Sequence, residues 1–284
     1  MSHLESWRAG FPELSRPLVM GVVNVTPDSF SDGGLFGTTD AAIRHGFELR
    51  DQGADVLDIG GESTRPGATR PLVAEELDRV VPVIRALAEQ DVPVSVDTMR
   101  SEVARAALEA GAVVVNDVSG GLADPAILDV VAEHGAAYVV MHWRAHSSVM
   151  QQLASYDDVL VEVRDELALR LEAATAAGIA ADRLVVDPGL GFAKTADHNW
   201  ELLRRLPELG TLGVPILVGS SRKSFLGSLL AAPDGSPRPV LDREGANVAL
   251  TTIAAIQGVW GVRVHEVRGS IDALKVVTKW RVNG

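Results

Sequence analysis

Short apolar runs rich in Val, Ile and Leu recur along the chain, and each run ends in polar residues. They occupy residues 18–25, 55–61, 92–98, 112–120, 137–142, 184–191, 215–221 and 259–267. The runs are continuous rather than alternating, which is typical of strands buried on both faces in a parallel sheet covered by helices. The pattern therefore predicts eight parallel strands.

Amphipathic stretches with a helical period lie between these runs, for example at residues 39–53, 73–90, 99–111 and 158–178. Several of them finish in glycine, the residue that most often ends a helix in a left-handed conformation. Eight strands alternating with eight helices in about 250 residues is the arrangement of a (β/α)8 barrel. We therefore predict an α/β fold of the TIM-barrel type in a single domain. A doubly wound open sheet is the alternative, but no GxGxxG follows the first strand.

No linker divides the chain. We expect residues 1–17 to form an N-terminal extension and residues 18–284 to form the barrel domain. The Pro- and Gly-rich stretch 231–245 is expected as a surface loop between the seventh strand and its helix. Residues 245–262 carry no charge over nearly the length of a membrane span. Polar residues and a glycine break within this stretch favour a buried helix followed by a strand.

Composition and charge restrict the function. The 284 residues carry 26 Lys plus Arg against 38 Asp plus Glu, a net charge of −12, and include no cysteine. Without a strong local basic patch, so acidic a chain is not expected to bind nucleic acid or a membrane surface. The lack of cysteine excludes disulfides, thiolate nucleophiles and cysteine-based metal sites. The polar N-terminus has no targeting pattern, so we expect a cytoplasmic protein.

Polar and charged residues follow the predicted strands, at the end of a barrel where active sites are built. They are Asn24, Glu62, Ser63, Thr64, Arg65, Asp97, Asn116, His142, Asp187, Arg222, Lys223, Arg263 and His265. Helix caps and turns account for a single Asp or Asn, but they do not require lysine, arginine and histidine. The cations predict a site for an anion such as phosphate or pyrophosphate near the last two strands.

Two loops are unusually long, those after the first and second strands, and they predict lids over a substrate. HExxH and GxSxG are absent, so neither a histidine-based zinc site nor a serine triad is expected. Oxygen ligands such as Asn24 and Asp28 remain open as a magnesium site shared with substrate phosphates.

Several motifs resemble those of one enzyme family, and they occur in the same order from about residue 18 to residue 280. They are MGVVNVTPDSFSDGG, GGESTRPG, SVDTMR, NDVSGG, MHWR, DPGLGFAKT, GSSRKSFLG and VRVHEV. The sequence resembles the dihydropteroate synthases, the pterin-binding (β/α)8 transferases of folate biosynthesis, and particularly their actinobacterial type. The resemblance implies condensation of 6-hydroxymethyl-7,8-dihydropterin pyrophosphate with 4-aminobenzoate through a dissociative substitution. It also implies Mg²⁺ as cofactor and a homodimer.

The resemblance assigns roles to individual residues. The pterin would be bound by Asp97, Asn116, Met141, Asp187, Phe192, Lys223 and Arg263. The pyrophosphate would be bound by Asn24, which also holds the metal, and by Arg65, Arg263 and His265. The 4-aminobenzoate pocket would contain Thr64, Pro66, Phe192 and Ser224, and the lid would contain Asp28, Phe30 and Asp32. The catalytic residues would be Asp97, Lys223, Asp187 and Arg263. The lack of an extra aromatic-Gly insertion predicts sensitivity to sulfonamides.

Two other functions are compatible with a pterin-binding barrel. A corrinoid-dependent methyltransferase should lack the SRKSFLG and NVTPDSFSDGG segments, both of which are present. A non-catalytic pterin-binding paralogue should have lost part of its anion site, yet Asn24, Arg65, Lys223, Arg263 and His265 are all in place. We therefore rank both below the synthase.

Overall fold

Eight parallel strands form one sheet in the order β8-β7-β6-β5-β4-β3-β10-β9. The computed structural model describes residues 7–8, 11–12, 14–26, 39–62, 70–146 and 150–281. The strands are β3 (Leu18–Asn24), β4 (Val56–Gly60), β5 (Val94–Asp97), β6 (Val114–Asp117), β7 (Ala137–Met141), β8 (Leu184–Asp187), β9 (Leu217–Val218) and β10 (Gly261–Val264). A bridge between Val186 and Ile216 joins the two outer strands of this order. The sheet thus closes into a barrel, which confirms the predicted fold and excludes the open sheet.

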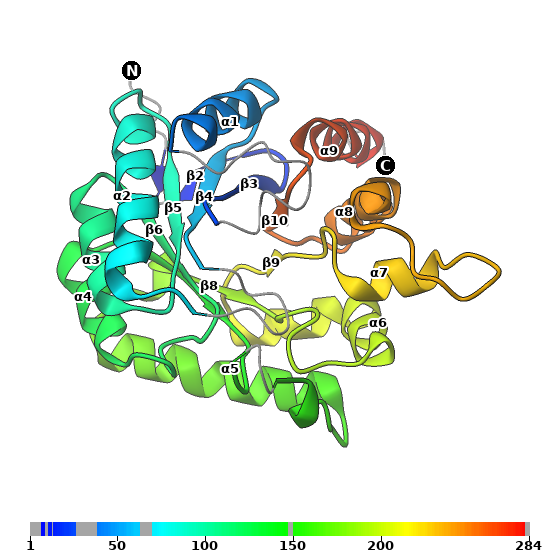
Figure 1. Ribbon diagram of the computed structural model, residues 1–284. Coiled ribbons are helices and arrows are strands. Elements are labelled where there is room, and N and C mark those ends of the chain that lie inside the picture. Colours follow the sequence, from blue (N-terminus) through cyan, green and yellow to red (C-terminus); the bar gives the residue numbers. More distant parts are fainter. Residues whose placement is uncertain are drawn as a thin grey trace.

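Helices surround the strands in chain order (Figure 1). They are α1 (Thr39–Asp51), α2 (Val73–Ala88), α3 (Ser101–Glu109), α4 (Ala126–His134), α5 (Val159–Ala176), α6 (Ala196–Arg204), α7 (Ser224–Leu229), α8 (Glu244–Ile256) and α9 (Val267–Arg281). Short 3₁₀ helices occur at η3 (Met150–Leu153), η4 (Ala181–Arg183), η5 (Leu206–Leu212) and η6 (Val240–Arg243). Outside the barrel sheet, β1 (Trp7–Arg8) and β2 (Phe11–Pro12) pair antiparallel. No helix in these described ranges is long and apolar enough to span a membrane.

Two sequence expectations about the last quarter of the chain need correction. The loop 231–245 does not separate the seventh strand from its helix, because α7 follows that strand directly and the loop leads on to α8. Arg243 in this loop is buried and donates to the carbonyls of Arg222 and Lys223, which ties the loop back to the strand end. The last helix begins at Val267 rather than near Ser270, since the Glu266 carboxylate caps its first turn.

Side chains alternate between two cores along each barrel strand. Outward-facing residues such as Val19, Leu57 and Val140 pack against the helices. Inward-facing residues fill the barrel with aliphatic side chains, which are Leu18, Met20, Val56, Val114, Ala137, Val139, Val185 and Leu217. Because both faces are apolar, these strands read as continuous runs in the sequence.

The two ends of the barrel are chemically different. At the N-terminal end, Arg16 donates two hydrogen bonds to Asp55 at 2.7 and 2.9 Å, and the Val19 N–H donates to the same carboxylate. At the C-terminal end, inward-facing polar residues replace the aliphatic ones. This second end is where the predicted site residues lie.

Candidate active site

A cluster of charged side chains lies inside the C-terminal end of the barrel. Arg263 donates from Nε to Asp58 Oδ2 and from Nη2 to Asp97 Oδ2, both at 2.6 Å. Asn116 Nδ2 donates to the same Asp58 oxygen at 2.9 Å. The register of the strands brings these side chains together, because Asp97 of β5 pairs with Gly60 of β4 on one side and with Asn116 of β6 on the other. Paired residues of neighbouring parallel strands face the same side of the sheet.

Asp58 is a charged member of this cluster that the sequence did not predict. It stands in the middle of β4 rather than at its end, and it is 0% exposed. Its Oδ2 carries the bonds from Arg263 and Asn116, while Oδ1 has no hydrogen-bond partner among the described residues. A carboxylate within a strand buried on both faces was the available signal, since a buried charge needs a partner.

The charges of this cluster shift one another's pKa values. Burial raises the pKa of Asp97 to about 7; the Arg263 charge opposes this rise and the Asp58 carboxylate adds to it. Burial alone would lower the pKa of Arg263, but Asp58 and Asp97 raise it above its ordinary value. The guanidinium therefore stays charged, whereas Asp97 titrates near neutral pH.

A second carboxylate and its cations lie at the ends of β8 and β9. Asp187 Oδ1 accepts a hydrogen bond from the Gly189 N–H at 2.7 Å. Burial raises the pKa of Asp187, while this bond and the charges of Lys223 and Arg263 oppose the rise. Burial lowers the pKa of Lys223 to about 8, and the Asp187 charge opposes that change. The Lys223 Nζ lies 4.2 Å from the centroid of the Phe192 ring.

Two glycines leave room between these carboxylates. A Cβ on Gly60 would lie 3.6 Å from Asn24 Oδ1 and 3.7 Å from Asp97 Oδ2. A Cβ on Gly219 would lie 3.6 Å from Asp187 Oδ2. The absence of both side chains keeps space inside the mouth for a ligand that faces several carboxylate oxygens.

An apolar group borders the charged cluster. Its buried members follow or end four neighbouring strands and are Met99, Val118, Met141, Phe192 and Ala193. Met141 and Phe192 were predicted as walls of the site, and they pack together here. Met99 and Val118 were not predicted, although each follows an acidic or polar strand end that was.

Other predicted residues occupy the expected strand ends. Asn24 ends β3, and Ser224 begins α7 directly after Lys223. His265 follows β10, with its Nδ1 3.0 Å from Ser221 Oγ. These positions place nitrogen and oxygen groups around the same barrel mouth.

Two residues that the sequence assigned to the mouth form other contacts. His142 is 1% exposed, and its Nε2 lies 2.9 Å from Glu166 Oε2 of α5, on the outer side of the barrel. Arg222 donates from Nε to Glu244 Oε1 of α8 at 3.0 Å. Both side chains therefore serve the packing of strand ends against helices.

Seven predicted residues lie outside the described residues. They are Asp28, Phe30, Asp32, Ser63, Thr64, Arg65 and Pro66. Their assigned roles in the lid, the anion site and the 4-aminobenzoate pocket stay predictions.

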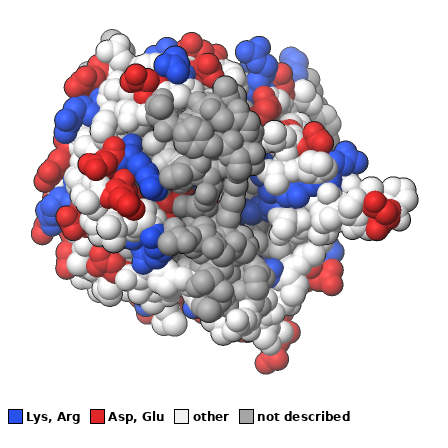
Figure 2. All heavy atoms as spheres, in the orientation of Figure 1, with Lys and Arg blue, Asp and Glu red and all other residues white. Residues whose placement is uncertain are grey.

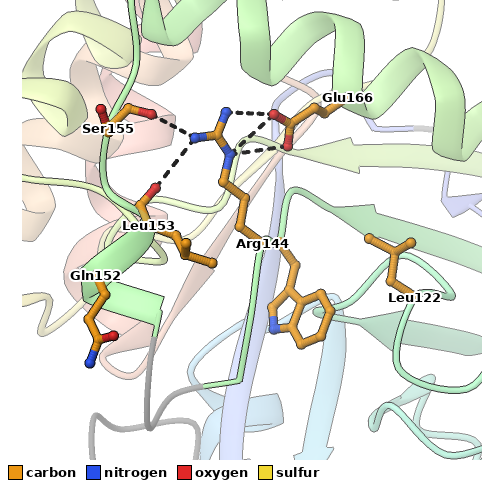
Figure 3. A pocket seen from close by; sticks show the side chains of 7 residues that line it. Leu122, Arg144, Gln152, Leu153, Ser155 and Glu166 are labelled. Carbon is orange, nitrogen blue, oxygen red and sulfur yellow. Dashed lines mark hydrogen bonds and ion pairs between the residues drawn. The ribbon is translucent and has the colours of Figure 1, made fainter.

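Figure 3 shows a second feature of the structure, a pocket of about 530 Å³. It is lined by Leu122, Trp143, Arg144, Gln152, Leu153, Ser155 and Glu166. None of these seven residues was predicted to bind substrate. The lining residues also include none of the cluster formed by Arg263, Asp58, Asp97 and Asn116.

The surface over this end of the barrel carries charges of both signs (Figure 2). Acidic side chains are spread over the surrounding helices, and several Lys and Arg side chains border the central region. In the part of the chain that the structure describes, no group of three or more His, Asp or Glu residues could hold a metal ion.

Known proteins resemble this chain over almost its whole length. The family profile described as pterin binding enzyme matches residues 20–265. Dihydropteroate synthase of Mycobacterium leprae is 56% identical over 263 residues, which cover 92% of this chain and 93% of that relative.

Solved structures agree with this similarity. Yersinia pestis dihydropteroate synthase in complex with a sulfonamide drug gives a TM-score of 0.89 at 43% identity, covering 95% of this chain and 96% of that chain. Xanthomonas albilineans dihydropteroate synthase with 4-aminobenzoic acid gives 0.84 at 48% identity, covering 94% and 93%. The chain therefore belongs to the dihydropteroate synthase family of pterin-binding enzymes.

Proposed function

We propose that the barrel mouth condenses 6-hydroxymethyl-7,8-dihydropterin pyrophosphate with 4-aminobenzoate, forming 7,8-dihydropteroate and pyrophosphate. The observation that carries this proposal is the buried cluster in which Arg263 lies between Asp58 and Asp97, with Asp187 and Lys223 beside it. Carboxylates for a cationic centre and cations for a leaving anion are thereby gathered within one small space.

The pterin ring is bound by the inward-facing carboxylates and amide. The ring edge donates to the carboxylates of Asp187 and Asp97, and the Asn116 amide can both donate and accept there. A carboxylate that faces two N–H donors forms strong charge-assisted bonds. Lys223 donates to the ring oxygen and N5, while Arg263 stacks on the ring. The apolar group at the strand ends covers the remaining surface.

The reaction is dissociative, and electrostatics assists both halves of the breaking bond. When the methylene C–O bond breaks, its electron pair leaves with the pyrophosphate and the methylene carbon becomes cationic. Asp97 and Asp187 stabilise the cation, and Arg65, Arg263 and His265 stabilise the leaving group. The neutral amine of 4-aminobenzoate then forms the new C–N bond and releases one proton, so that no strong base is required.

A magnesium ion fits the oxygen donors at this end of the barrel. Asn24 Oδ1 and the Asp97 carboxylate both face the space above Gly60, and oxygen ligands suit a hard cation that keeps several waters and substrate phosphates. Asn24 would hold the ion, which would neutralise charge on the pyrophosphate oxygens.

The second substrate is proposed to bind over the loop side of the mouth. Thr64, Pro66, Phe192 and Ser224 form its pocket, with Asp28, Phe30 and Asp32 in a lid. The Xanthomonas albilineans relative was solved with 4-aminobenzoic acid and the Yersinia pestis relative with a sulfonamide drug. These ligands support sulfonamide sensitivity of this chain.

The protein is further proposed to act in the cytoplasm as a homodimer, without nucleic-acid or membrane partners. Exposed apolar side chains on α8 and α9 support self-association, since Ile253, Ile256, Val276 and Trp280 are 45 to 67% exposed. Sedimentation velocity of the purified protein would test the dimer.

Incubation of the purified protein with both substrates and Mg²⁺ tests the activity. We expect equimolar 7,8-dihydropteroate and pyrophosphate, quantified by chromatography and a coupled phosphate assay. Tight pterin binding without pyrophosphate release would identify a non-catalytic paralogue and overturn the proposal.

A further inference from the structure

A buried lysine lies directly behind the apolar wall of the site. Lys194 is 3% exposed, and its Nζ lies 2.8 Å from His142 Nδ1 and 3.1 Å from the Phe192 carbonyl oxygen. His142 in turn contacts Glu166 Oε2 through Nε2 at 2.9 Å. A chain of hydrogen bonds thus runs from α5 to the backbone of a residue that lines the mouth. None of the roles assigned above uses Lys194.

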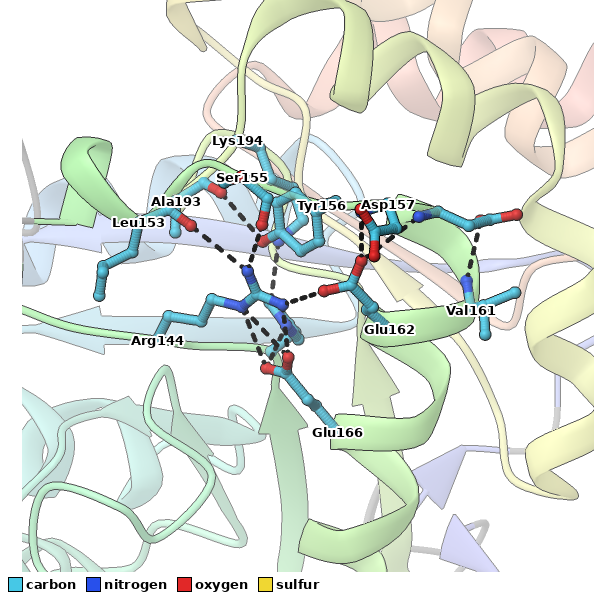
Figure 4. Close-up of polar contacts among 12 residues, drawn as sticks. Arg144, Leu153, Ser155, Tyr156, Asp157, Val161, Glu162, Glu166, Ala193 and Lys194 are labelled. Atoms are coloured by element: carbon cyan, nitrogen blue, oxygen red, sulfur yellow. Dashed lines mark hydrogen bonds and ion pairs between the residues drawn. The ribbon is translucent and has the colours of Figure 1, made fainter.

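This chain of contacts is held at its outer end by Arg144 (Figure 4). Arg144 donates to Glu166 Oε1 at 2.6 Å and to Glu162 Oε2 at 2.8 Å. Its guanidinium carbon also lies 3.9 Å from the centre of the Tyr156 ring. Glu166 is thereby fixed, and burial, which would raise its pKa, is outweighed by His142 and Arg144, which lower that pKa to about 2.

The loop between β8 and α6 is clamped by these groups. Besides the bond from Lys194 to the Phe192 carbonyl, the Tyr156 hydroxyl donates to the Ala193 carbonyl at 2.9 Å. Ala193 has φ of 48°, a left-handed conformation that costs free energy for a residue with a Cβ. Gly189 lies so close to the His142 carbonyl that a Cβ there would clash with it. The wall residue Phe192 is therefore held in a strained loop by side chains outside the barrel.

The hydrogen-bond partners determine which nitrogen atoms of His142 and Lys194 carry protons. The Glu166 carboxylate can only accept, so His142 Nε2 carries a proton and donates it. His142 Nδ1 must then accept from the Lys194 amine, because a proton on both would bring two donors together. Burial and the Lys194 charge accordingly lower the pKa of His142 to about 4.

Lys194 also adds positive charge near the pterin-edge carboxylate. The groups that act on it are Asp187, Arg144, Glu166, Lys223 and His142. Burial lowers the pKa of Lys194 to about 7, and the negative charge of Asp187 is the main effect that opposes this fall. Lys194 in turn helps to hold down the pKa of Asp187.

We infer that Lys194 is a positioning residue for the pterin site, which holds the Phe192 wall through its backbone and supplies a second cation behind Asp187. This inference rests on the proposed function. It assigns a role to the His142–Glu166–Arg144 contacts as the support that keeps Lys194 in place.

Calorimetric titration of the full-length protein with 6-hydroxymethyl-7,8-dihydropterin pyrophosphate and Mg²⁺ tests the inference. Lys194→Met should weaken binding by about tenfold near pH 6, where Lys194 is charged. The ratio of the two Kd values should fall as the pH rises to about 9, because the wild-type lysine then loses its charge and keeps only its hydrogen bond to the Phe192 carbonyl. Asp97 titrates in both proteins, so its own pH dependence is common to the two binding curves.

Two further variants separate charge from folding. Lys194→Gln keeps a hydrogen-bond donor without a charge, and it should share the pH-dependent ratio even if Lys194→Met folds poorly. Lys275→Met removes an exposed lysine on α9 and should bind like wild type at every pH. The His142 imidazole, followed by NMR, should show a higher pKa in both Lys194 variants, because the opposing charge is gone.

The possible results are distinguishable. A Kd ratio that stays constant with pH would show a merely structural role, and a ratio of one throughout would show no role; either overturns the inference. Failure of the wild-type protein to bind the pterin would instead overturn the proposed function.

Discussion

Asp58→Asn is the most informative single substitution at the mouth. The change keeps the shape of the side chain but removes the negative charge that accepts from Arg263 at 2.6 Å and from Asn116 at 2.9 Å. Both bonds end on Oδ2, while Oδ1 has no partner among the described residues, so an asparagine can keep both bonds with its single acceptor oxygen. Breaking a buried charge pair costs about 3–5 kcal/mol, and we expect a loss of unfolding free energy of about 3 kcal/mol, because the charge is lost while both hydrogen bonds can be kept.

We expect Asp58→Asn to have a larger effect on the catalytic rate than on the stability of the fold. Without the Asp58 charge, Arg263 is held less firmly in its position, and a shift of about 1 Å in a positioning group costs about 100-fold in rate. The carboxylate of Asp58 also contributes to the raised pKa of Asp97, near 7. Its removal lowers that pKa, so the acid limb of the kcat/KM profile should move to lower pH.

The assay is product formation across a pH series, with thermal unfolding measured on the same samples. Asp55→Asn is the matched control, because Asp55 likewise pairs with an arginine, in its case through both carboxylate oxygens and at the opposite end of the barrel. The control should lose stability and keep the wild-type pH profile. An acid limb that stays in place or moves upward in Asp58→Asn would refute the electrostatic coupling of Asp58 to Asp97.

Four further outcomes are expected. Asp97→Asn should lower kcat by about 100-fold with a much smaller change in pterin Kd, as for a group that acts on the transition state; equal losses would contradict that role. Gly60→Ala should fold normally, because its Cβ would meet Asn24 and Asp97 at ordinary contact distances of 3.6 Å, but pterin affinity measured by calorimetry should fall about tenfold. Chelation with EDTA should stop pyrophosphate release until Mg²⁺ is added, whereas a full rate in EDTA would exclude the metal. A saturating sulfonamide should abolish dihydropteroate formation in competition with 4-aminobenzoate, and undiminished product would show insensitivity.

The barrel could be predicted from sequence because its physical cause is periodic. Strands buried on both faces produce apolar runs, and the polar residues at their ends mark the mouth. Asp97, Asn116 and Asp187 follow from this rule, and the register brings Asp97 and Asn116 side by side. The helices after β9 did not follow, because the fold of α7 and its loop depends on Arg243 binding carbonyls distant in sequence.

The sequence identified the strand ends but did not show whether each side chain there faces into the barrel or outward. His142 continues the outward parity of Tyr138 and Val140, so it contacts α5 rather than the ligand space. Asp58 has the inward parity of Gly60 and lies one layer deeper. Lys194 lies beyond the strand entirely, and only the folded loop brings it to His142.

Two ionisable groups at or behind the mouth lower the stability of the folded protein, as the directions of their pKa shifts show. The pKa of Asp97 is raised in the folded protein, so the folded state binds more protons than the unfolded one between about pH 4 and 7, and stability falls as pH rises through that window. The pKa of Lys194 is lowered, so its contribution improves only as pH rises above about 7. At neutral pH both groups are therefore near their least favourable state for folding. A core selected for stability alone would replace them with aliphatic residues, as the lower layers of this barrel do. The desolvated space that Gly60 and Gly219 leave beside Asp97 and Asp187 is explained by a ligand that adds further partners, which are the N–H donors and the developing cation of a pterin.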